Sequence, residues 1–243
     1  MDSRRSHRRV SSILSDRADA RGWDRLRDEW NHRVPTTSTV RAADSEDRER
    51  AMTIPALVLA SASPRRRRLL ERMGIEFTVR PTRVPEDLRE AEAPRQYVER
   101  LAREKAMAEA GERDELLLGS DTVVVLDDEV LGKPRDAAHA RELLRRLAGR
   151  THRVLTGVAA IAEGASRVLH VTTRVTMRAY DEAELRAYVA TGEPLDKAGA
   201  YAIQGEGGRL VARVAGSRTN VIGLPVEETL RLLASLGVRP ERA

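Results

Sequence analysis

The chain has 243 residues and a net charge of +5, from 43 Lys plus Arg against 38 Asp plus Glu, and it contains no cysteine. The lack of cysteine excludes disulfides and thiolate metal sites and fits a reducing cytosol, and no apolar run approaches the length of a membrane span. Charges of both signs are closely mixed, which is typical of a solvated surface and argues against a nucleic-acid partner. We therefore expect a cytoplasmic protein that binds neither membrane nor nucleic acid.

Residues 1–51 differ in composition from the rest of the chain. They are rich in arginine and in acids and have almost no periodic apolar residues, so they cannot bury enough apolar surface to offset the entropy of ordering. We expect a disordered or weakly helical extension. Met52 follows directly and is an alternative start of translation, so the folded body is expected over residues 52–243.

The first half of this body alternates strands and helices. The apolar run at 56–60 predicts a buried strand, and a proline at position 64 opens a helix that ends at Gly74. Further elements are expected in this order: a strand at 75–79, a helix at about 94–110, a strand at 116–126 and an amphipathic helix at 137–147.

The second half reads mostly as strands. Segments 153–162 and 168–177 are separated by a glycine-containing turn, which predicts a hairpin. The remaining expectations are a short helix at 181–189, a glycine-rich loop at 191–208 with a short strand at 201–203, a strand at 209–214 and a closing helix at 226–236. Early alternation and late hairpins together predict an α/β fold with a mixed, twisted β-sheet flanked by helices.

A candidate anion site stands at the start of the first helix. Ser63 fits the N-cap, and the proline after it fits the first helical position, so free backbone N–H groups and the positive end of the helix dipole would face the preceding loop. Ser61, Arg65 and Arg66 would add donors suited to phosphate. An ordinary capped helix is the alternative, and within the four arginines at 65–68 some must point to solvent.

Two charged residues occupy positions where apolar ones would be typical. Asp121, with Gly119 and Ser120, interrupts an otherwise apolar strand, and Lys105 lies on the apolar stripe of its helix. A buried carboxylate needs a partner, a proton or a metal, so Asp121 is a catalytic candidate. The alternatives are a bulge in which Asp121 caps the backbone, and a Lys105 whose ammonium reaches the surface at the helix end.

Lysine is rare in this chain. Lys105, Lys133 and Lys197 are the only lysines among 43 basic residues, and lysine offers a compact point charge where arginine offers a planar fork. With the acids Glu86 and Asp121, and with no histidine pair at metal-ligand spacing, this inventory suits attack of water on a polyphosphate, assisted by a Mg²⁺ ion that carboxylates hold. Taken alone, Glu86 would be read as a solvated surface residue.

Two polar residues of the second half remain. His152 is expected to be a hydrogen-bonded strand residue rather than a base. Gln204 could read the edge of a nucleotide base, since its amide offers both a donor and an acceptor; packing in a turn is the alternative.

The chain resembles the Maf nucleotide pyrophosphatases over roughly residues 54–237. Seven blocks carry the resemblance in order: ASASPRR at 60–66, LAREKA at 101–106, GSDTVV at 119–124, GKPR at 132–135, GRTHRVLTG at 149–157, GEPLDKAGAYAIQG at 192–205 and NVIGLP at 220–225. Several blocks in one register are far more specific than any single motif. Residues 1–51 lie outside it.

The resemblance implies hydrolysis of a nucleoside triphosphate to the monophosphate and pyrophosphate. It also implies a divalent cation, Mg²⁺ with Mn²⁺ as the alternative, and a homodimer. The implied fold is the single elongated α/β domain shared with the inosine triphosphate pyrophosphatases.

By the same resemblance, Asp121 is the catalytic base and, with Glu86, a metal ligand. The positions that would bind substrate are Ser61, Arg65, Arg66, Lys105, Lys133, Thr122 and Gln204.

Three of these positions bear on the base. The branch that acts on dTTP and UTP carries Arg, Thr and Gln where this chain has Arg65, Thr122 and Gln204, which favours a uracil or thymine nucleotide. The sister branch, which acts on 7-methyl-GTP, is the alternative within the family. Glu86 departs most from the family pattern because prolines flank its loop. A non-catalytic nucleic-acid binder that grips phosphates through residues 1–51 is the alternative outside the family.

Overall fold

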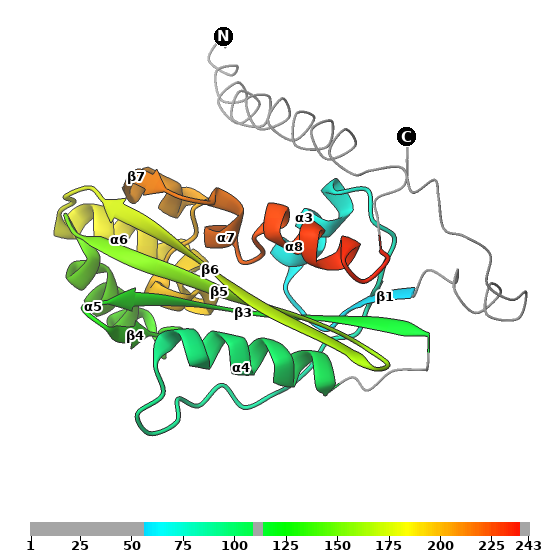
Figure 1. Ribbon diagram of the computed structural model, residues 1–243. Coiled ribbons are helices and arrows are strands. Elements are labelled where there is room, and N and C mark those ends of the chain that lie inside the picture. Colours follow the sequence, from blue (N-terminus) through cyan, green and yellow to red (C-terminus); the bar gives the residue numbers. More distant parts are fainter. Residues whose placement is uncertain (1–55, 109–113, 239–243) are drawn as a thin grey trace, which may run out of the picture. The chain divides into compact units, whose positions relative to one another are not determined.

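The computed structural model describes residues 56–108 and 114–238, which belong to one compact unit (Figure 1). The predicted extension at residues 1–51 lies outside the described residues. Within the described part, no helix is both long and apolar enough to cross a membrane.

A mixed sheet of seven strands forms the centre of the fold, as the sequence predicted. Its strand order is β2-β1-β3-β5-β6-β7, with β4 paired to β3. β1 runs parallel to β2 and β3, and the other pairs are antiparallel. The strands are β1 (Ala56–Leu59), β2 (Thr78–Val79), β3 (Glu115–Leu126), β4 (Glu129–Leu131), β5 (Thr151–Ala162), β6 (Ala165–Met177) and β7 (Val211–Ala215).

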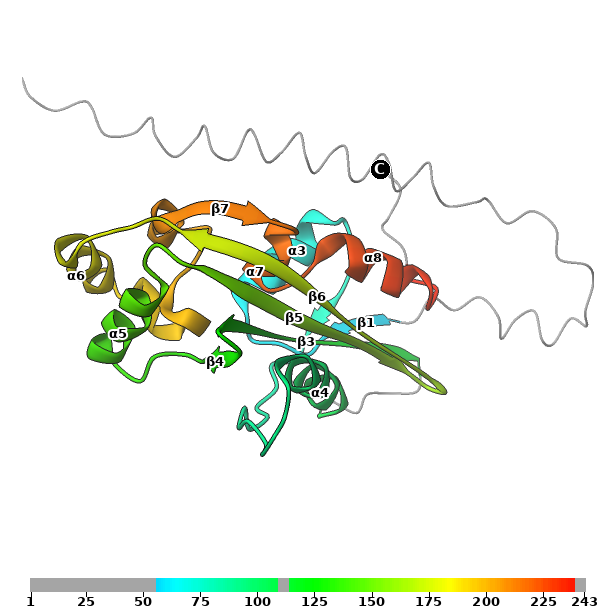
Figure 2. The ribbon, with the colours of Figure 1, turned by 60° about the vertical axis from the view of Figure 1, so that its left-hand side comes forward.

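Helices cover both faces of this sheet. In Figures 1 and 2, α4 lies on one face, and α3, α7 and α8 lie on the other. The helices are α3 (Pro64–Arg72), α4 (Pro94–Met107), α5 (Ala137–Leu147), α6 (Glu182–Ala190), α7 (Arg218–Ile222) and α8 (Val226–Ala234). Because side chains alternate along a strand, odd-numbered residues of β3 face α4 and even-numbered ones face the opposite layer.

β3 is continuous, so the expected interruption at residues 119–121 is wrong. Its pairing with β5 runs from Leu117 to Val125 without a shift in register, and Asp121 lies opposite Gly157. A bulge that uses Asp121 to cap the backbone is therefore excluded. Ladder hydrogen bonds satisfy the backbone whatever the side chain is, so a glycine and a carboxylate interrupt the apolar pattern but not the strand.

Two glycines let α4 approach the sheet very closely. A Cβ atom on Gly119 would lie 2.1 Å from the carbonyl oxygen of Ala102, and one on Gly157 would lie 2.1 Å from the carbonyl oxygen of Val98. Both contacts are far too short for any side chain. Glycine in neighbouring strands thus provides the groove in which α4 lies, and this depth brings the side chains of α4 to β3.

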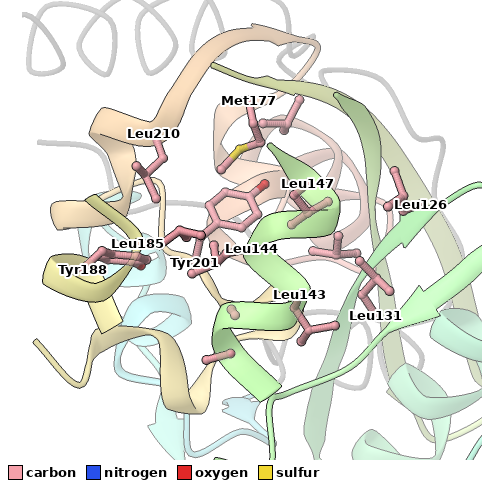
Figure 3. Close-up of a cluster of buried hydrophobic side chains, with 14 of the residues drawn as sticks. Leu126, Leu131, Leu143, Leu144, Leu147, Met177, Leu185, Tyr188, Tyr201 and Leu210 are labelled. Atoms are coloured by element: carbon pink, nitrogen blue, oxygen red, sulfur yellow. The ribbon is translucent and has the colours of Figure 1, made fainter. Parts of the chain in front are cut away.

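A large apolar cluster anchors the end of the sheet next to α5 and α6 (Figure 3). Leu143, Leu144 and Leu147 of α5 pack with Leu185 and Tyr188 of α6 and with side chains of β3, β5 and β6. With one phenylalanine in the whole chain, aliphatic side chains and a few tyrosines fill this core.

The histidine expected to be structural lies in this region. His152 is buried on β5, and its Nε2 is 2.8 Å from the hydroxyl oxygen of Tyr201. That interpretation of His152 is confirmed.

The segment at 191–208 differs most from expectation. It forms three short 3₁₀ helices, η1 (Glu193–Asp196), η2 (Ala198–Ala200) and η3 (Glu206–Leu210), and the strand expected at 201–203 is absent from it. Short 3₁₀ turns lack an apolar period, so pattern reading cannot find them. β4 and α7 were also missed because each is too short to show a period.

Candidate active site

A cavity opens along one edge of β3. On that edge β1 pairs with Glu115–Leu118 and β4 pairs with Val124–Leu126, so residues 119–123 have no strand beside them there. The cavity at this gap has a volume of about 580 Å³, within the range of small-ligand sites. Side chains from both faces of the sheet reach it, because the sheet is open at this point.

All nine residues predicted to bind substrate or metal, or to act as the base, line this cavity. They are Ser61, Arg65, Arg66, Glu86, Lys105, Asp121, Thr122, Lys133 and Gln204. Lys197 lines it as well, so the three lysines of the chain meet in one place although their positions in the sequence are far apart.

Lys105 and Asp121 form a buried ion pair in the lining of the cavity. The Lys105 side chain comes from α4 and Asp121 from an odd position of β3, and their residues are only 7% and 5% exposed. Lys105 Nζ donates to Asp121 Oδ1 at 2.6 Å and to Glu86 Oε1 at 2.7 Å. Two of the three N–H bonds of the ammonium are thus used, and one is left for a ligand.

Glu86 is held by two lysines. Its second oxygen, Oε2, accepts from Lys133 Nζ at 2.8 Å. Burial by itself raises the pKa of Glu86, but hydrogen bonds and charge from Lys105 and Lys133 outweigh burial and lower the pKa to about 2. Glu86 is therefore a carboxylate at any physiological pH. Tyr97, also on α4, donates its hydroxyl to the backbone oxygen of Glu86 at 2.7 Å and so fixes this loop.

Asp121 keeps one oxygen available. Its Oδ1 accepts from Lys105, whereas its Oδ2 has no hydrogen-bond partner among residues 56–108 and 114–238. A buried carboxylate with one engaged and one open oxygen is suited to accept a proton from a bound water molecule.

The anion site predicted at the start of α3 has the expected local geometry. Ser63 is the N-cap, and its side chain accepts from the backbone N–H of Arg66 at 3.5 Å. Ser61 Oγ accepts from the backbone N–H of Ser63 at 3.2 Å. Arg67 and Arg68 are exposed, so the run of four arginines divides between cavity and solvent as helix geometry requires. Arg65 forms a 3.9 Å ion pair with Asp196 of η1.

Arg66 is fixed at three points. Its Nε donates to the backbone oxygen of Gly223 at 2.8 Å, its Nη1 to Ser61 Oγ at 3.2 Å, and its Nη2 to Thr122 Oγ1 at 3.2 Å. Burial lowers the pKa of Arg66, with a smaller opposing effect from the charge of Asp121. Each Nη atom retains one free N–H, so the guanidinium presents two donors in a fixed orientation, which suits a phosphate.

Gln204 and Lys197 lie at the η1–η3 side of the cavity. Gln204 is exposed between η2 and η3. Lys197 is nearly buried, and its Nζ donates to the backbone oxygen of Glu193 at 3.3 Å and contacts Asp196. The amide of Gln204 thus joins the cavity lining from a segment that is distant in the chain from Glu86 and Asp121.

The acids of the cavity suit a metal ion that shares its ligands with substrate. Within the described residues, no group of three or more His, Cys, Asp or Glu side chains could enclose a metal by itself. Mg²⁺ commonly binds through one or two carboxylates together with substrate phosphates and water. Glu86 and Asp121, which contact the same ammonium, fit that kind of site.

Three neighbours of the site escaped sequence reasoning. Tyr97 gave no signal, since an aromatic residue on an apolar stripe reads as core. Gly223 and Asn220 belong to the NVIGLP block, whose sequence does not show which side chains these two residues contact. Gly223 has a backbone φ of 122°, a conformation that favours glycine, and its oxygen receives both Arg66 and the hydroxyl of Ser120.

The chain matches a known protein family and several curated proteins. The family model described as Maf-like protein matches residues 56–236. The dTTP/UTP pyrophosphatase of Vibrio cholerae serotype O1 is 50% identical over 184 residues, which cover 75% of this chain and 98% of that protein.

Two further relatives carry the same name. The dTTP/UTP pyrophosphatase of Anaeromyxobacter dehalogenans strain 2CP-C is 54% identical, with 75% of this chain and 95% of that protein covered. That of Myxococcus xanthus strain DK1622 is also 54% identical, with 75% and 93% covered. The matched part thus spans nearly the whole length of each relative.

Proposed function

Because this chain belongs to the Maf-like protein family, we propose that it hydrolyses nucleoside triphosphates, with dTTP and UTP as the favoured substrates, to the monophosphate and pyrophosphate. The observation that carries the proposal is the buried Lys105–Asp121 pair beside Arg66 in one cavity. Curated relatives named dTTP/UTP pyrophosphatase, about half identical in sequence, support the same reaction and the same substrates.

In the proposed reaction, water attacks the α-phosphorus of the nucleotide. Asp121 accepts the proton of this water through its open oxygen, a new P–O bond forms, and the bond from the α-phosphorus to the bridging oxygen breaks. Pyrophosphate leaves with the electron pair of that bond. The products are the nucleoside monophosphate and pyrophosphate, and the proton of the attacking water is on Asp121.

The other cationic groups would bind and stabilise the phosphates. Arg65, Arg66, Ser61 and the N–H groups at the start of α3 would hold the triphosphate chain. The free N–H of Lys105, with Lys133, would offset the negative charge that develops during displacement, and such electrostatic stabilisation usually contributes most to phosphoryl transfer. Glu86 and Asp121 would hold a Mg²⁺ or Mn²⁺ ion, whose charge would neutralise phosphate oxygens.

A substrate panel tests this proposal directly. We expect purified protein with Mg²⁺ to release pyrophosphate from dTTP and UTP much faster than from CTP, GTP or 7-methyl-GTP. A preference for 7-methyl-GTP would move the protein to the sister branch, and no pyrophosphate from any nucleotide would reject the proposed function. Chelation by EDTA should stop turnover and added Mg²⁺ should restore it; turnover that persists in EDTA would rule out the metal.

Replacement of the proposed base tests the mechanism. Asp121→Asn should lower kcat by at least about 100-fold, since general-base catalysis typically contributes that much or more. Its melting temperature should show that the fold is intact. Asp128→Asn is the matched control, because Asp128 lies in the turn after the same strand and pairs with Arg153 in an exposed position. A wild-type kcat in Asp121→Asn would contradict the assigned role.

On the resemblance, we also propose a cytoplasmic homodimer. Light scattering coupled to gel filtration should give about twice the mass of one chain. A mass of one chain at micromolar concentration would contradict this assembly.

A further inference from the structure

A chain of hydrogen bonds runs from Arg66 through the sheet to α7. Arg66 Nη2 donates to Thr122 Oγ1, and Thr122 Oγ1 lies 2.9 Å from Thr156 Oγ1 on β5. Thr156 Oγ1 in turn donates to the backbone oxygen of Asn220 at 2.9 Å. Thr156 and Asn220 are fully buried, and neither lines the cavity.

The direction of every bond in this chain follows from counting protons. A carbonyl oxygen only accepts, so the single hydroxyl proton of Thr156 is given to Asn220. Thr122 must then be the donor in the bond between the two hydroxyl groups. Arg66 has no acceptor, so it donates to Thr122. The hydroxyl proton of Thr122 therefore points away from Arg66, and the hydroxyl oxygen offers Arg66 a lone pair.

The far end of the chain is also fixed. The side-chain amide of Asn220 donates from Nδ2 to the backbone oxygen of Val154 and to Thr173 Oγ1, both at 3.0 Å. Since the oxygen of Val154 only accepts, the amide cannot be reversed without placing two oxygens together. These two bonds anchor α7 to the sheet. They also hold the backbone oxygen of Asn220 within hydrogen-bond distance of Thr156 Oγ1.

We propose that Thr156 and Asn220 are positioning residues that fix the hydroxyl of Thr122 as an acceptor and so orient Arg66 for a phosphate. Without Thr156, the proton of Thr122 is free to turn toward Arg66, where it opposes the guanidinium N–H. The fixed orientation has a second consequence. Thr122 has no proton to offer a phosphate oxygen, so its part in phosphate binding is to hold Arg66.

The test uses inorganic pyrophosphate with the full-length chain, measured by calorimetry. The inference rests on the proposed function for its kinetic readout, but pyrophosphate binding is measured without turnover. Thr156→Val removes the hydroxyl at nearly constant shape. It should weaken pyrophosphate binding about tenfold, because the bond from Arg66 to Thr122 then loses its fixed acceptor, and hydrogen bonds to charged groups are among the stronger ones. Thr156→Ser keeps the hydroxyl and should restore wild-type binding. In kinetics, KM should rise more than kcat falls.

Thr151→Val is the matched control. Thr151 is on the same strand and pairs with Thr176 Oγ1 at 2.9 Å, but this pair is exposed and away from the cavity. The control should bind pyrophosphate like the wild type. A Thr156→Val protein that does the same would overturn the proposal.

A double-mutant cycle separates positioning from a general loss of packing. In an Arg66→Lys background, Thr156→Val should have little further effect on pyrophosphate binding, because the group that it orients is gone. Equal effects in both backgrounds would overturn the proposal. If Thr156→Val does not fold, Thr122→Val decides in its place, since Thr122 is only half-buried; unchanged binding there is equally fatal.

Failure of the two proposals is distinguishable. Wild-type protein that binds pyrophosphate but hydrolyses no nucleotide would reject the proposed function, and the variants would still decide the role of Thr156. If the wild-type protein did not bind pyrophosphate, the proposal that Arg66 is oriented for a phosphate would also be overturned.

Discussion

His152 is a titratable side chain in the core, on β5. It is 2% exposed, its Nε2 contacts Tyr201, and its Nδ1 has no partner among the described residues. Burial disfavours the charged imidazolium and lowers the pKa from 6.5 to about 4. At pH 5 the folded protein therefore keeps this ring neutral, whereas the unfolded chain binds a proton there.

This difference predicts how stability depends on pH. Between the two pKa values the unfolded state binds more protons, so the free energy of unfolding falls as pH drops from about 6.5 toward 4. His152 should contribute a loss of about 2 kcal/mol between pH 7.5 and pH 5. In His152→Gln, urea unfolding should show a correspondingly smaller loss over this range. If His152→Gln lost as much stability as the wild type over this range, the ring of His152 would take up its proton in the folded protein as readily as in the unfolded chain.

The charged side chains of the site share their partners. Lys105 satisfies two carboxylates at once, and Glu86 receives two lysines. Lys105 and Asp121 are the buried members of this cluster, so removing the ammonium of Lys105 leaves the buried carboxylate of Asp121 uncompensated, which is strongly destabilising. Asp121→Asn is a milder change, because the amide keeps an oxygen that can still accept from Lys105.

At the scale of elements, the depth of α4 in the sheet determines the site. α4 carries Tyr97 and Lys105, and both reach their partners only because Gly119 and Gly157 leave room for the helix backbone. Gly119 lies two residues before Asp121 on β3, and Gly157 is the residue that pairs with Asp121 on β5. The same close approach thus packs the helix and assembles the charged cluster.

Substitution of these glycines should affect stability and activity together. Gly119→Ala or Gly157→Ala would force α4 outward, and overpacking of this kind costs about 1–3 kcal/mol. Lys105 would then be displaced from Asp121, so kcat should fall as well. Melting temperature and pyrophosphate release measure the two effects.

Gly132→Ala is the control for stability, since a Cβ atom there would meet nothing within 4 Å. It should melt like the wild type. If Gly119→Ala did too, the close contact with Ala102 would not exist in solution.

At the scale of the whole chain, the family match covers residues 56–236, and the curated relatives are matched over nearly their full lengths. The complete cavity is built from residues between Ser61 and Gly223. We therefore expect the part of the chain that follows residue 51 to contain everything that the reaction needs.

Truncation tests this expectation. A protein that begins at Met52 should fold and should keep kcat and KM within about twofold of the full-length values. Loss of activity in a well-folded truncated protein would give residues 1–51 a part in catalysis. Mass spectrometry of the native N-terminus would show whether residues 1–51 are present in the cell.

Much of this molecule could be read from the sequence because its signals are local. Helix starts, the hairpin at β5 and β6 and the apolar strands follow from periodicity and capping, and the scarcity of lysine pointed to Lys105 and Lys133. The ordered blocks of the family pattern indicated the reaction. Such features depend on residues close together in the chain, where spacing alone decides geometry.

Tertiary structure decided the rest. Only pairing with β5 shows that β3 is continuous through Gly119 and Asp121, and only the contact with α4 explains that glycine. The partners of Arg66 come from the residue that follows α7, from β3 and from the loop after β1. Hydrogen bonds between segments so distant in the chain leave no periodic trace in sequence, because their geometry exists only once the sheet and its helices are packed.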